Sequence, residues 1–295
     1  MTKLFGRKYS LTVTSVDGEE LVIVPPMQVQ FQVTNMPQDQ VSTATITVFG
    51  VSAKYRQLIQ HYDTSEKHYG SVRLEAGYDE SVGEVFSGQI QSVEVGREGV
   101  NVYLRLKCLL AIWSDATIGK TWGNKTQASE ILHDVARSFY YPVEMVGDFS
   151  DLPTFNYGHT LAHSSSRDFL NKMKAAWGYE WLLDHNRVVI IRNGASRPIT
   201  HQLSASNGME GVPKWNQQDM EVDVRLNTII QPGDRVHITS DFWTINYTGT
   251  QQKEFQALAM AHTTSGSFRV LSTSHQGDYW NNDWKTTIRC QWRST

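Results

Sequence analysis

The chain has 295 residues, of which 40% are hydrophobic and 19% are charged, and its formal net charge at pH 7 is −3. This composition is that of a folded globular protein and excludes the fibrous and intrinsically disordered classes. With 27 basic against 30 acidic residues, the chain has no surplus of positive charge for phosphates, which argues against a dedicated nucleic-acid-binding protein.

Residues 1–111 repeat short segments in which apolar and polar side chains alternate, and this period of two is typical of half-buried β-strands. In residues 27–33 three glutamines alternate with apolar residues, and in residues 43–48 threonines take the polar positions. Residues 52–59 predict a short helix capped by Ser52. So many short strands predict a closed or nearly closed antiparallel β-barrel.

Between residues 112 and 212 the pattern changes to mixed α/β. In residues 126–139 the apolar side chains recur at helical spacing, which predicts a first helix. A second helix follows and ends at Gly178, because glycine readily adopts the left-handed conformation that closes a helix. Residues 179–192 predict a β-hairpin, and the Ser, Asn, Gly and Pro residues between 197 and 215 predict a linker.

The strand pattern returns in residues 213–295, and its last hairpin resembles the last hairpin of the first region. Residues 86–108 contain a strand, a glycine-containing turn and a strand that ends in Cys108. Residues 266–290 contain the same features in the same order and end in Cys290. This order favours a duplicated barrel; the alternative is that any two antiparallel hairpins look alike, because the alternation itself is generic.

The predicted fold class is therefore mainly β with an α/β insertion. Two tube-like antiparallel β-barrels, residues 1–111 and residues 213–295, are separated by a small mixed domain of two helices plus a hairpin, residues 112–212.

Three features bear on where the chain works. The longest apolar run, residues 108–113, is far shorter than the roughly 20 residues of a transmembrane helix. Arg7 and Lys8 interrupt the apolar character of the N-terminal segment, so we expect no signal peptide and no export. Cys108 and Cys290 are too few for a disulfide framework or a zinc site and are expected to be reduced core residues.

The C-terminal region carries three short motifs in a fixed order: Pro-Gly at 232–233, Gly-x-Phe-x-Val at 266–270 and His-x-Gly-Asp at 275–278. With LEAGY at 74–78 and FSGQIQSV at 86–93, this order resembles tailed-bacteriophage baseplate hub proteins and the related hub portion of type VI secretion spike proteins. The resemblance covers nearly the whole chain in the order barrel, insertion, barrel.

The resemblance implies a structural protein with no enzymatic activity and no cofactor. It implies a homotrimer that presents six barrels, joins the sixfold tail tube to the threefold central spike and lines the axial channel. The implied partners are the tail tube or distal tail protein above, the central spike below, and tape measure and wedge proteins; no membrane is involved, and DNA passes without specific binding. The implied location is the tail baseplate of the virion, after assembly in the host cytoplasm.

Uncharged polar side chains suit a channel through which DNA slides, because a basic lining would bind the phosphates. The candidate channel-lining residues are Gln28, Gln30, Gln32, Thr43, Thr45 and Thr47. A plainer interpretation is that these side chains are the solvated face of a sheet.

The nine tryptophans and twelve tyrosines favour permanent interfaces or cores. The candidate interface aromatics are Trp280, Trp284 and Trp292. The same three residues suit the platform of a carbohydrate-binding β module of a cell-surface recognition apparatus, which is the main alternative function. A cell-wall hydrolase built on residues 112–212 is less favoured, since only scattered carboxylates and histidines support it.

Two pairs of polar residues resemble functional sites, and each has a simpler explanation. His159 and His163 have the spacing of metal ligands on a helix, but Gly158 makes a helix doubtful there. His275 and Asp278 resemble a catalytic pair, but the resemblance places them in a hairpin turn. The sequence therefore predicts no catalytic, cofactor-binding or metal site.

Overall fold

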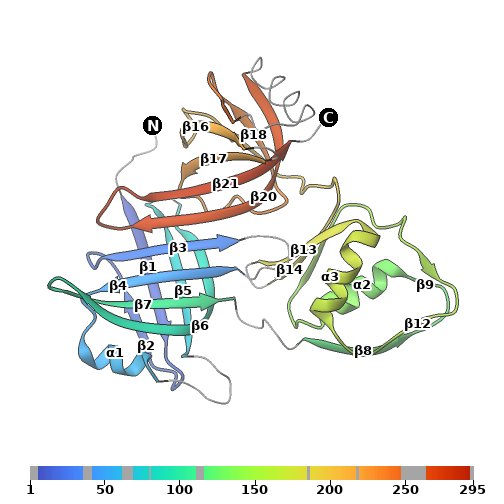
Figure 1. Ribbon diagram of the computed structural model, residues 1–295, viewed down its shortest axis with the longest axis horizontal. Coiled ribbons are helices and arrows are strands. Elements are labelled where there is room, and N and C mark those ends of the chain that lie inside the picture. Colours follow the sequence, from blue (N-terminus) through green and yellow to red (C-terminus); the bar gives the residue numbers. More distant parts are fainter. Residues whose placement is uncertain are drawn as a thin grey trace. The chain divides into compact units, whose positions relative to one another are not determined.

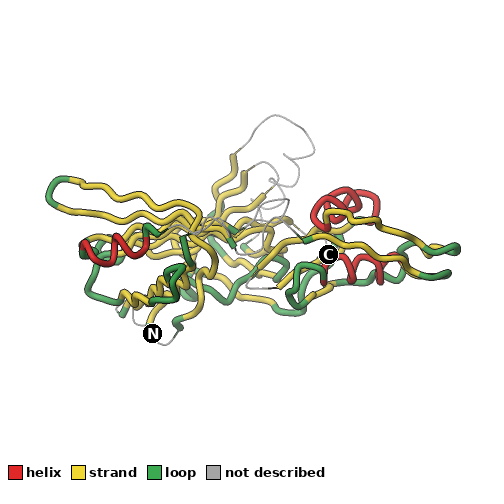
Figure 2. Tube along the Cα trace, turned by 90° about the horizontal axis from the view of Figure 1, so that it is seen from below, coloured by secondary structure: helices red, strands yellow, loops and turns green. Residues whose placement is uncertain are grey.

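The structure is a computed structural model (Figure 1) that describes residues 6–35, 42–61, 69–79, 81–110, 116–184, 187–216, 219–246 and 264–292. The chain folds as two compact units. The large unit contains the described residues up to Leu110 and those from Thr200 onward, and the small unit ends at Ile199. Strands make up most of the described chain (Figure 2).

The large unit is one sheet of fourteen strands with one short helix, α1 (Ala53–Ile59). Its first half contains β1 (Arg7–Thr14), β2 (Glu20–Ile23), β3 (Val29–Asn35), β4 (Thr43–Phe49), β5 (Ser71–Tyr78), β6 (Gly83–Glu98) and β7 (Asn101–Leu109). Its second half contains β15 (Thr200–Leu203), β16 (Met209–Asn216), β17 (Asp219–Arg225), β18 (Arg235–Thr239), β19 (Thr244–Asn246), β20 (Ser265–Asp278) and β21 (Trp284–Trp292).

The strand order along the sheet is β19-β16-β17-β21-β20-β3-β4-β7-β6-β5-β1-β2, and β18 pairs with both β15 and β20. The prediction of a mainly β fold is confirmed. The described strands of the large unit form one continuous sheet, where the sequence predicted two separate barrels, because β3 of the first half pairs directly with β20 of the second.

The long strand β20 joins the two halves. Its first part, Ser265–Arg269, pairs with β18, and its last part, Thr273–Asp278, pairs with β3 along the same edge. The opposite edge pairs with β21. His275 and Asp278 thus lie within a strand, and the prediction that they form the turn is wrong, since strand pairing with β3 extends to Asp278.

The same five-strand arrangement occurs in each half, as β3-β4-β7-β6-β5 and as β16-β17-β21-β20-β18. Cys108 pairs with Ile90 and Cys290 with Val270, and in both hairpins the register shifts directly after that pair. The two cysteine strands are therefore equivalent, as predicted. Residues of β6 correspond to residues numbered 180 higher in β20, and residues of β7 to residues numbered 182 higher in β21.

One face of the sheet is apolar in both halves. In the first half, strand side chains such as Leu11, Ile46 and Leu104 form one buried cluster, and in the second half Val222 and its neighbours form another. Trp284 comes from a second-half strand but belongs to the first cluster. The halves are therefore joined by core packing as well as by backbone hydrogen bonds.

The predicted linker between residues 197 and 215 is wrong, because β15 and most of β16 lie there. The predicted domain boundary at residue 212 falls within β16. Turn-forming residues occur inside β16 because its register with β17 shifts between Glu210 and Lys214, and Gly211 takes a positive φ of 73° in this irregularity.

The small unit contains two helices and several short strands. They are β8 (Thr117–Trp122), β9 (Thr126–Gln127), α2 (Ala128–Arg137), β10 (Val143–Val146), β11 (Thr154–Phe155), β12 (His159–Ser165), α3 (Ser166–Trp177), β13 (Tyr179–Asp184) and β14 (Arg187–Arg192). Both predicted helices and the predicted hairpin are confirmed, and α3 ends at Gly178 with φ 58°. Within the described chain, no helix has the length and apolar character to span a bilayer.

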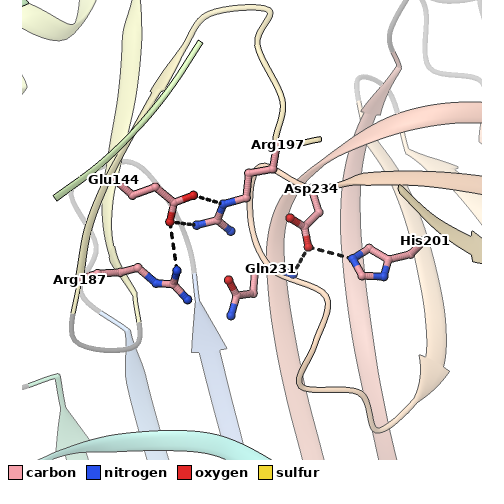
Figure 3. A network of polar contacts seen from close by, with 6 residues as sticks. All are labelled: Glu144, Arg187, Arg197, His201, Gln231 and Asp234. Atoms are coloured by element: carbon pink, nitrogen blue, oxygen red, sulfur yellow. Dashed lines mark hydrogen bonds and ion pairs between the residues drawn. The ribbon is translucent and has the colours of Figure 1, made fainter. Parts of the chain in front are cut away.

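Figure 3 shows a polar cluster in each unit. In the small unit, the Glu144 carboxylate accepts two hydrogen bonds from Arg197, at 2.7 and 2.9 Å, and one from Arg187 at 3.1 Å. In the large unit, the Asp234 carboxylate lies 2.9 Å from the ring Nε2 of His201. Each cluster links neighbouring segments of its own unit through paired polar groups, of which Arg197 and Asp234 are buried.

Candidate functional site

A polar surface crosses the large sheet on the side opposite the apolar clusters. Directly opposite residues of paired strands point to the same side of a sheet, so the register identifies its members. One row crosses seven strands and consists of Arg225, Lys285, Gln276, Gln32, Thr45, Lys107 and Ser92. The rows on either side consist of Asp278, Gln30, Thr47, Arg105 and Glu94, and of Asp223, Thr287, Ser274, Thr34 and Thr43. We call these three rows the polar face.

Five of the six predicted channel-lining residues belong to the polar face. They are Gln30, Gln32, Thr43, Thr45 and Thr47. Gln28 precedes β3, and its side-chain amide donates to Asp278 at 3.3 Å. Thr47 is buried, and its hydroxyl accepts a hydrogen bond from Nε of Arg105 at 3.4 Å. The sequence pattern thus grouped residues that share one face of the sheet, but it missed the residues that the other strands contribute to this face.

Asp278 lies at the end of β20 and connects the two halves on the polar face. Its carboxylate accepts hydrogen bonds from the amides of Gln30 at 2.8 Å and Asn281 at 2.6 Å, and from the backbone N–H of Trp280 at 3.0 Å. Burial alone would raise the pKa of Asp278, but these hydrogen bonds outweigh it and hold the pKa below its usual value. The carboxylate is therefore charged at neutral pH, and both of its oxygens accept hydrogen bonds.

A hollow of about 300 Å³ lies on the polar face where β20, β3 and β4 meet. Its lining includes Gln30, Gln32, Thr45, Gln276 and Asp278. The side chains are mostly uncharged amides and hydroxyls that hydrogen-bond well to water. Such a lining has the hydrogen-bonding groups to hold water.

Two of the four cations on the polar face, Lys285 and Arg105, are paired with carboxylates on adjacent strands. Nζ of Lys285 lies 2.9 Å from Oδ2 of Asp223. Burial alone would raise the pKa of Asp223, but a hydrogen bond from the Thr287 hydroxyl and the contact with Lys285 together lower it, and the same contact raises the pKa of Lys285. In the first half, an amino group of the Arg105 guanidinium lies 3.2 Å from Oε2 of Glu94. Such pairing reduces the attraction that these cations exert on a phosphate backbone.

The three candidate interface tryptophans have different environments. Trp284 is 2% exposed, packs edge-on against Phe31 and donates from Nε1 to the carbonyl of Gly77 at 3.1 Å. It is a core residue, so its assignment to an interface is wrong, because its β-strand position faces the apolar cluster. Trp280 is 64% exposed, and its Nε1 donates to the carbonyl of Pro26 at 3.0 Å. The side chain of Trp292 lies outside the described residues.

The aromatic platform of a carbohydrate-binding module also depends on these tryptophans. The buried Trp284 cannot contribute to such a platform, and the exposed indole of Trp280 does not amount to one. Among the side chains that the structure describes, these tryptophans therefore do not assemble the platform that this alternative function requires.

The two residue pairs that resembled functional sites in the sequence do not form such sites in the structure. His159 and His163 lie on strand β12 and not on a helix. The ring Nδ1 of the buried His275 lies 2.8 Å from Oγ1 of Thr286 on the apolar side, whereas Asp278 lies on the polar face, so these two residues do not form a pair. Among the residues that the structure describes, no group of three His, Cys, Asp or Glu side chains is arranged to hold a metal ion.

Three solved structures share this fold at very low sequence identity. A tail protein from Neisseria meningitidis MC58 has a TM-score of 0.59 and 10% identity, with 97% of each chain covered. A 43 kDa tail protein of prophage MuSo2 from Shewanella oneidensis has a TM-score of 0.60 and 8% identity, with 97% of this chain and 96% of that chain covered.

The third structure is the Escherichia coli c3393 protein, a component of the type VI secretion system with structural similarity to the bacteriophage T4 tail proteins gp27 and gp5. It has a TM-score of 0.55 and 6% identity, with 91% of this chain and 74% of that chain covered. These identities show a common fold. A search of curated protein sequences finds no match.

The sequence profile of the baseplate hub gp41 family matches residues 10–246, which is most of the chain. The matched region begins in β1 and continues through the small unit into the second half of the sheet. The expected resemblance is therefore confirmed at the level of sequence, and the fold of the large unit agrees with it. The chain belongs to the baseplate hub gp41 family and is a structural component of a phage tail baseplate.

Proposed function

We propose that this protein is a homotrimeric baseplate hub that adapts a sixfold tail tube to a threefold central spike. The observation that carries the proposal is the repeated five-strand arrangement within one continuous sheet. Three chains with two arrangements each supply six equivalent arrangements around one axis. Such an assembly has threefold symmetry in its chains and approximate sixfold symmetry in its strands.

Closure of the sheet against neighbouring chains also explains why the large sheet of a single chain has free ends. A sheet with free ends exposes unpaired backbone N–H and C=O groups, and a closed barrel removes them. In this proposal each half completes its tube-like barrel against neighbouring halves, alternately within the chain and between chains. The two barrels expected from the sequence then exist only in the assembly.

The polar face lines the axial channel in this proposal. Four of the seven residues in its central row are amides or hydroxyls, and the ion pairs Lys285–Asp223 and Arg105–Glu94 compensate two of the four cations on the face. DNA binds proteins chiefly through phosphate contacts with lysine and arginine. A lining in which uncharged polar side chains dominate the centre and part of the positive charge is paired lets DNA pass without specific binding.

The partners follow from the symmetry. The sixfold end of the trimer meets the tail tube or distal tail protein, and the threefold end meets the central spike, with tape measure and wedge proteins as further neighbours. The protein acts in the virion as a structural part, after assembly in the host cytoplasm. It performs no catalysis in this role.

Native mass spectrometry of the purified full chain tests the proposed stoichiometry. One chain has a mass of 33.5 kDa, so a trimer has a mass of about 100 kDa. We expect a trimer as the largest well-defined species. A stable dimer, tetramer or hexamer would contradict the threefold adaptor, and specific glycan binding by a monomer would favour the carbohydrate-binding alternative.

A further inference from the structure

We propose that the turn after β14, from Arg192 to Ala195, is a site of spontaneous covalent modification. In this turn the side-chain amide of Asn193 is converted to a carboxylate. The reacting groups belong to the chain itself and to water, so the conversion needs no enzyme. The site lies in the small unit and goes beyond the proposed hub function, on which it does not depend.

The chemistry follows from an asparagine that directly precedes a glycine. Glycine has no side chain to shield its backbone nitrogen, so the nitrogen of Gly194 can approach Cγ of Asn193. The N–Cγ bond forms, the Cγ–Nδ2 bond breaks, and the side-chain nitrogen leaves as ammonia with the proton of the attacking N–H. Water then opens the resulting succinimide ring. Attack at the side-chain carbonyl gives aspartate, and attack at the backbone carbonyl gives isoaspartate, which adds a methylene group to the main chain.

The turn leaves the reacting groups free to move. Asn193 and Gly194 are both exposed, and the turn is closed by a hydrogen bond of 2.8 Å from the Ala195 N–H to the Arg192 carbonyl. The Asn193 N–H donates to the carbonyl of Gly178 at 2.8 Å, which fixes the chain before the bond that must rotate. Among the described residues, none hydrogen-bonds to the Asn193 side chain or to the N–H or carbonyl of Gly194.

A second Asn-Gly pair, Asn207 and Gly208 in the large unit, has the same two residues but is held in place. The Asn207 amide donates from Nδ2 to the Gln202 carbonyl at 2.6 Å, and its N–H donates to the Ser204 carbonyl at 2.9 Å. The Gly208 carbonyl accepts a hydrogen bond from the Arg225 N–H at 2.8 Å. Cyclisation would strain or break these contacts, so the structure protects Asn207 although the dipeptide is identical.

The new carboxylate would arise beside a guanidinium that already holds two elements together. A Cβ atom at Gly178 would lie 3.0 Å from Nη1 of Arg192 and 3.6 Å from Nδ2 of Asn193, so both side chains reach the same spot. Arg192 donates to the Gly178 carbonyl at 3.1 Å and to Asp151 at 2.5 Å, which ties the end of α3 to β14. A carboxylate at position 193 therefore competes with Asp151 for this guanidinium.

Incubation of the purified full chain at physiological temperature in mildly alkaline buffer tests the proposal. Digestion with pepsin at acidic pH stops the cyclisation, and fragment-ion mass spectrometry then assigns the loss of amide to each asparagine. In the folded chain we expect Asn193 to convert about tenfold faster than Asn207, or more, because the second site must first open locally. In guanidinium chloride, where neither site is held, we expect similar rates.

Asn193→Gln is the control variant, because its longer side chain closes a ring far more slowly. It should abolish the conversion at this position and leave the rate at Asn207 unchanged, and circular dichroism should show that the variant folds. Equal rates at the two sites in the folded chain, faster conversion of Asn207, or an intact Asn193 under conditions in which the unfolded chain reacts would each overturn the proposal. None of these results bears on the hub role.

Discussion

The β20–β21 hairpin and the β6–β7 hairpin share a bulge and a cysteine at corresponding positions, yet among the described strands only the first has a partner along the last part of its outer edge. β3 covers the last part of β20, and the core of the first half encloses Trp284. The corresponding part of β6 keeps an open edge among the described strands. The same pair of strands therefore belongs to the protein core where another strand covers it, as in β20. It lies at the surface where no described strand covers it, as in β6.

The largest effect should come from the tryptophan at the junction of the two halves. Trp284→Ala removes a side chain enclosed by Phe31 and Tyr279, and loss of a buried aromatic typically costs about 3–5 kcal/mol. The corresponding residue in the other hairpin is the partly exposed Val102, and Val102→Ala should cost less than about 1 kcal/mol. Urea unfolding of both variants measures the difference, and equal losses would refute the contrast between the hairpins.

A smaller loss of stability is expected at Gly277, where the junction of the two halves has no room for a side chain. A Cβ atom at Gly277 would lie 2.3 Å from Cζ of Phe31, so Gly277→Ala forces the buried ring to move, at a cost of about 1–3 kcal/mol. Arg97 holds the corresponding position on the open edge of β6, and Arg97→Ala should change stability by less than about 0.5 kcal/mol. Thermal unfolding gives both values, and a neutral Gly277→Ala would show that the junction is loosely packed.

The ion pairs of the polar face should differ in their dependence on pH. Because the pKa of Asp223 is lowered in the folded chain, its contribution is present above the ordinary aspartate pKa of about 3.9 and is lost as pH falls through the lower folded value. Asp223→Asn should therefore flatten the loss of stability between about pH 4 and lower pH.

The control for this pH dependence is Glu94→Gln, because Glu94 pairs with Arg105 at an exposed position of the other half. Solvent screens this pair, so the slope of unfolding free energy against pH should change less than in Asp223→Asn. Chemical unfolding over a pH series decides between them. An equal change in both variants would mean that burial does not distinguish the two pairs.

The smallest difference is expected at the two cysteines. Burial raises the pKa of both thiols, Cys108 in one half and Cys290 in the other. We expect neither to react with iodoacetamide in the folded chain at neutral pH and both to react after unfolding, as mass spectrometry will show. Rapid labelling of only one of them would indicate that the two halves are not equally closed around their equivalent strands.

Local patterns in the sequence were sufficient to predict the elements that depend on neighbouring residues. The alternation of apolar and polar residues identified the face of β3 and β4, and Gly178 marked the end of α3. The pairing of β3 with β20 was not predictable in this way, because no local pattern encodes which distant strand completes an edge.

Two wrong predictions arose because the pairing of β3 with β20 was not foreseen. Without it the halves were expected to be separate barrels, and Trp284 was expected at an interface although it enters the core of the first half. The Gly- and Pro-containing segment before Trp215 was interpreted as a linker, since a bulged strand uses the same residue types as a loop. Most polar-face residues outside β3 and β4 were also not predicted. They share one face only through the register of strands that are distant in sequence.

A reconstruction of the assembled tail by electron cryomicroscopy, at a resolution that traces strands, tests the central claim most directly. We expect three copies of the chain at the end of the tail tube, six repeats of the five-strand arrangement around the axis, and the rows of Gln32 and Gln30 turned toward the channel. A ring in which the apolar clusters or the outer loops face the channel, or a hub with a number of copies other than three, would contradict the account.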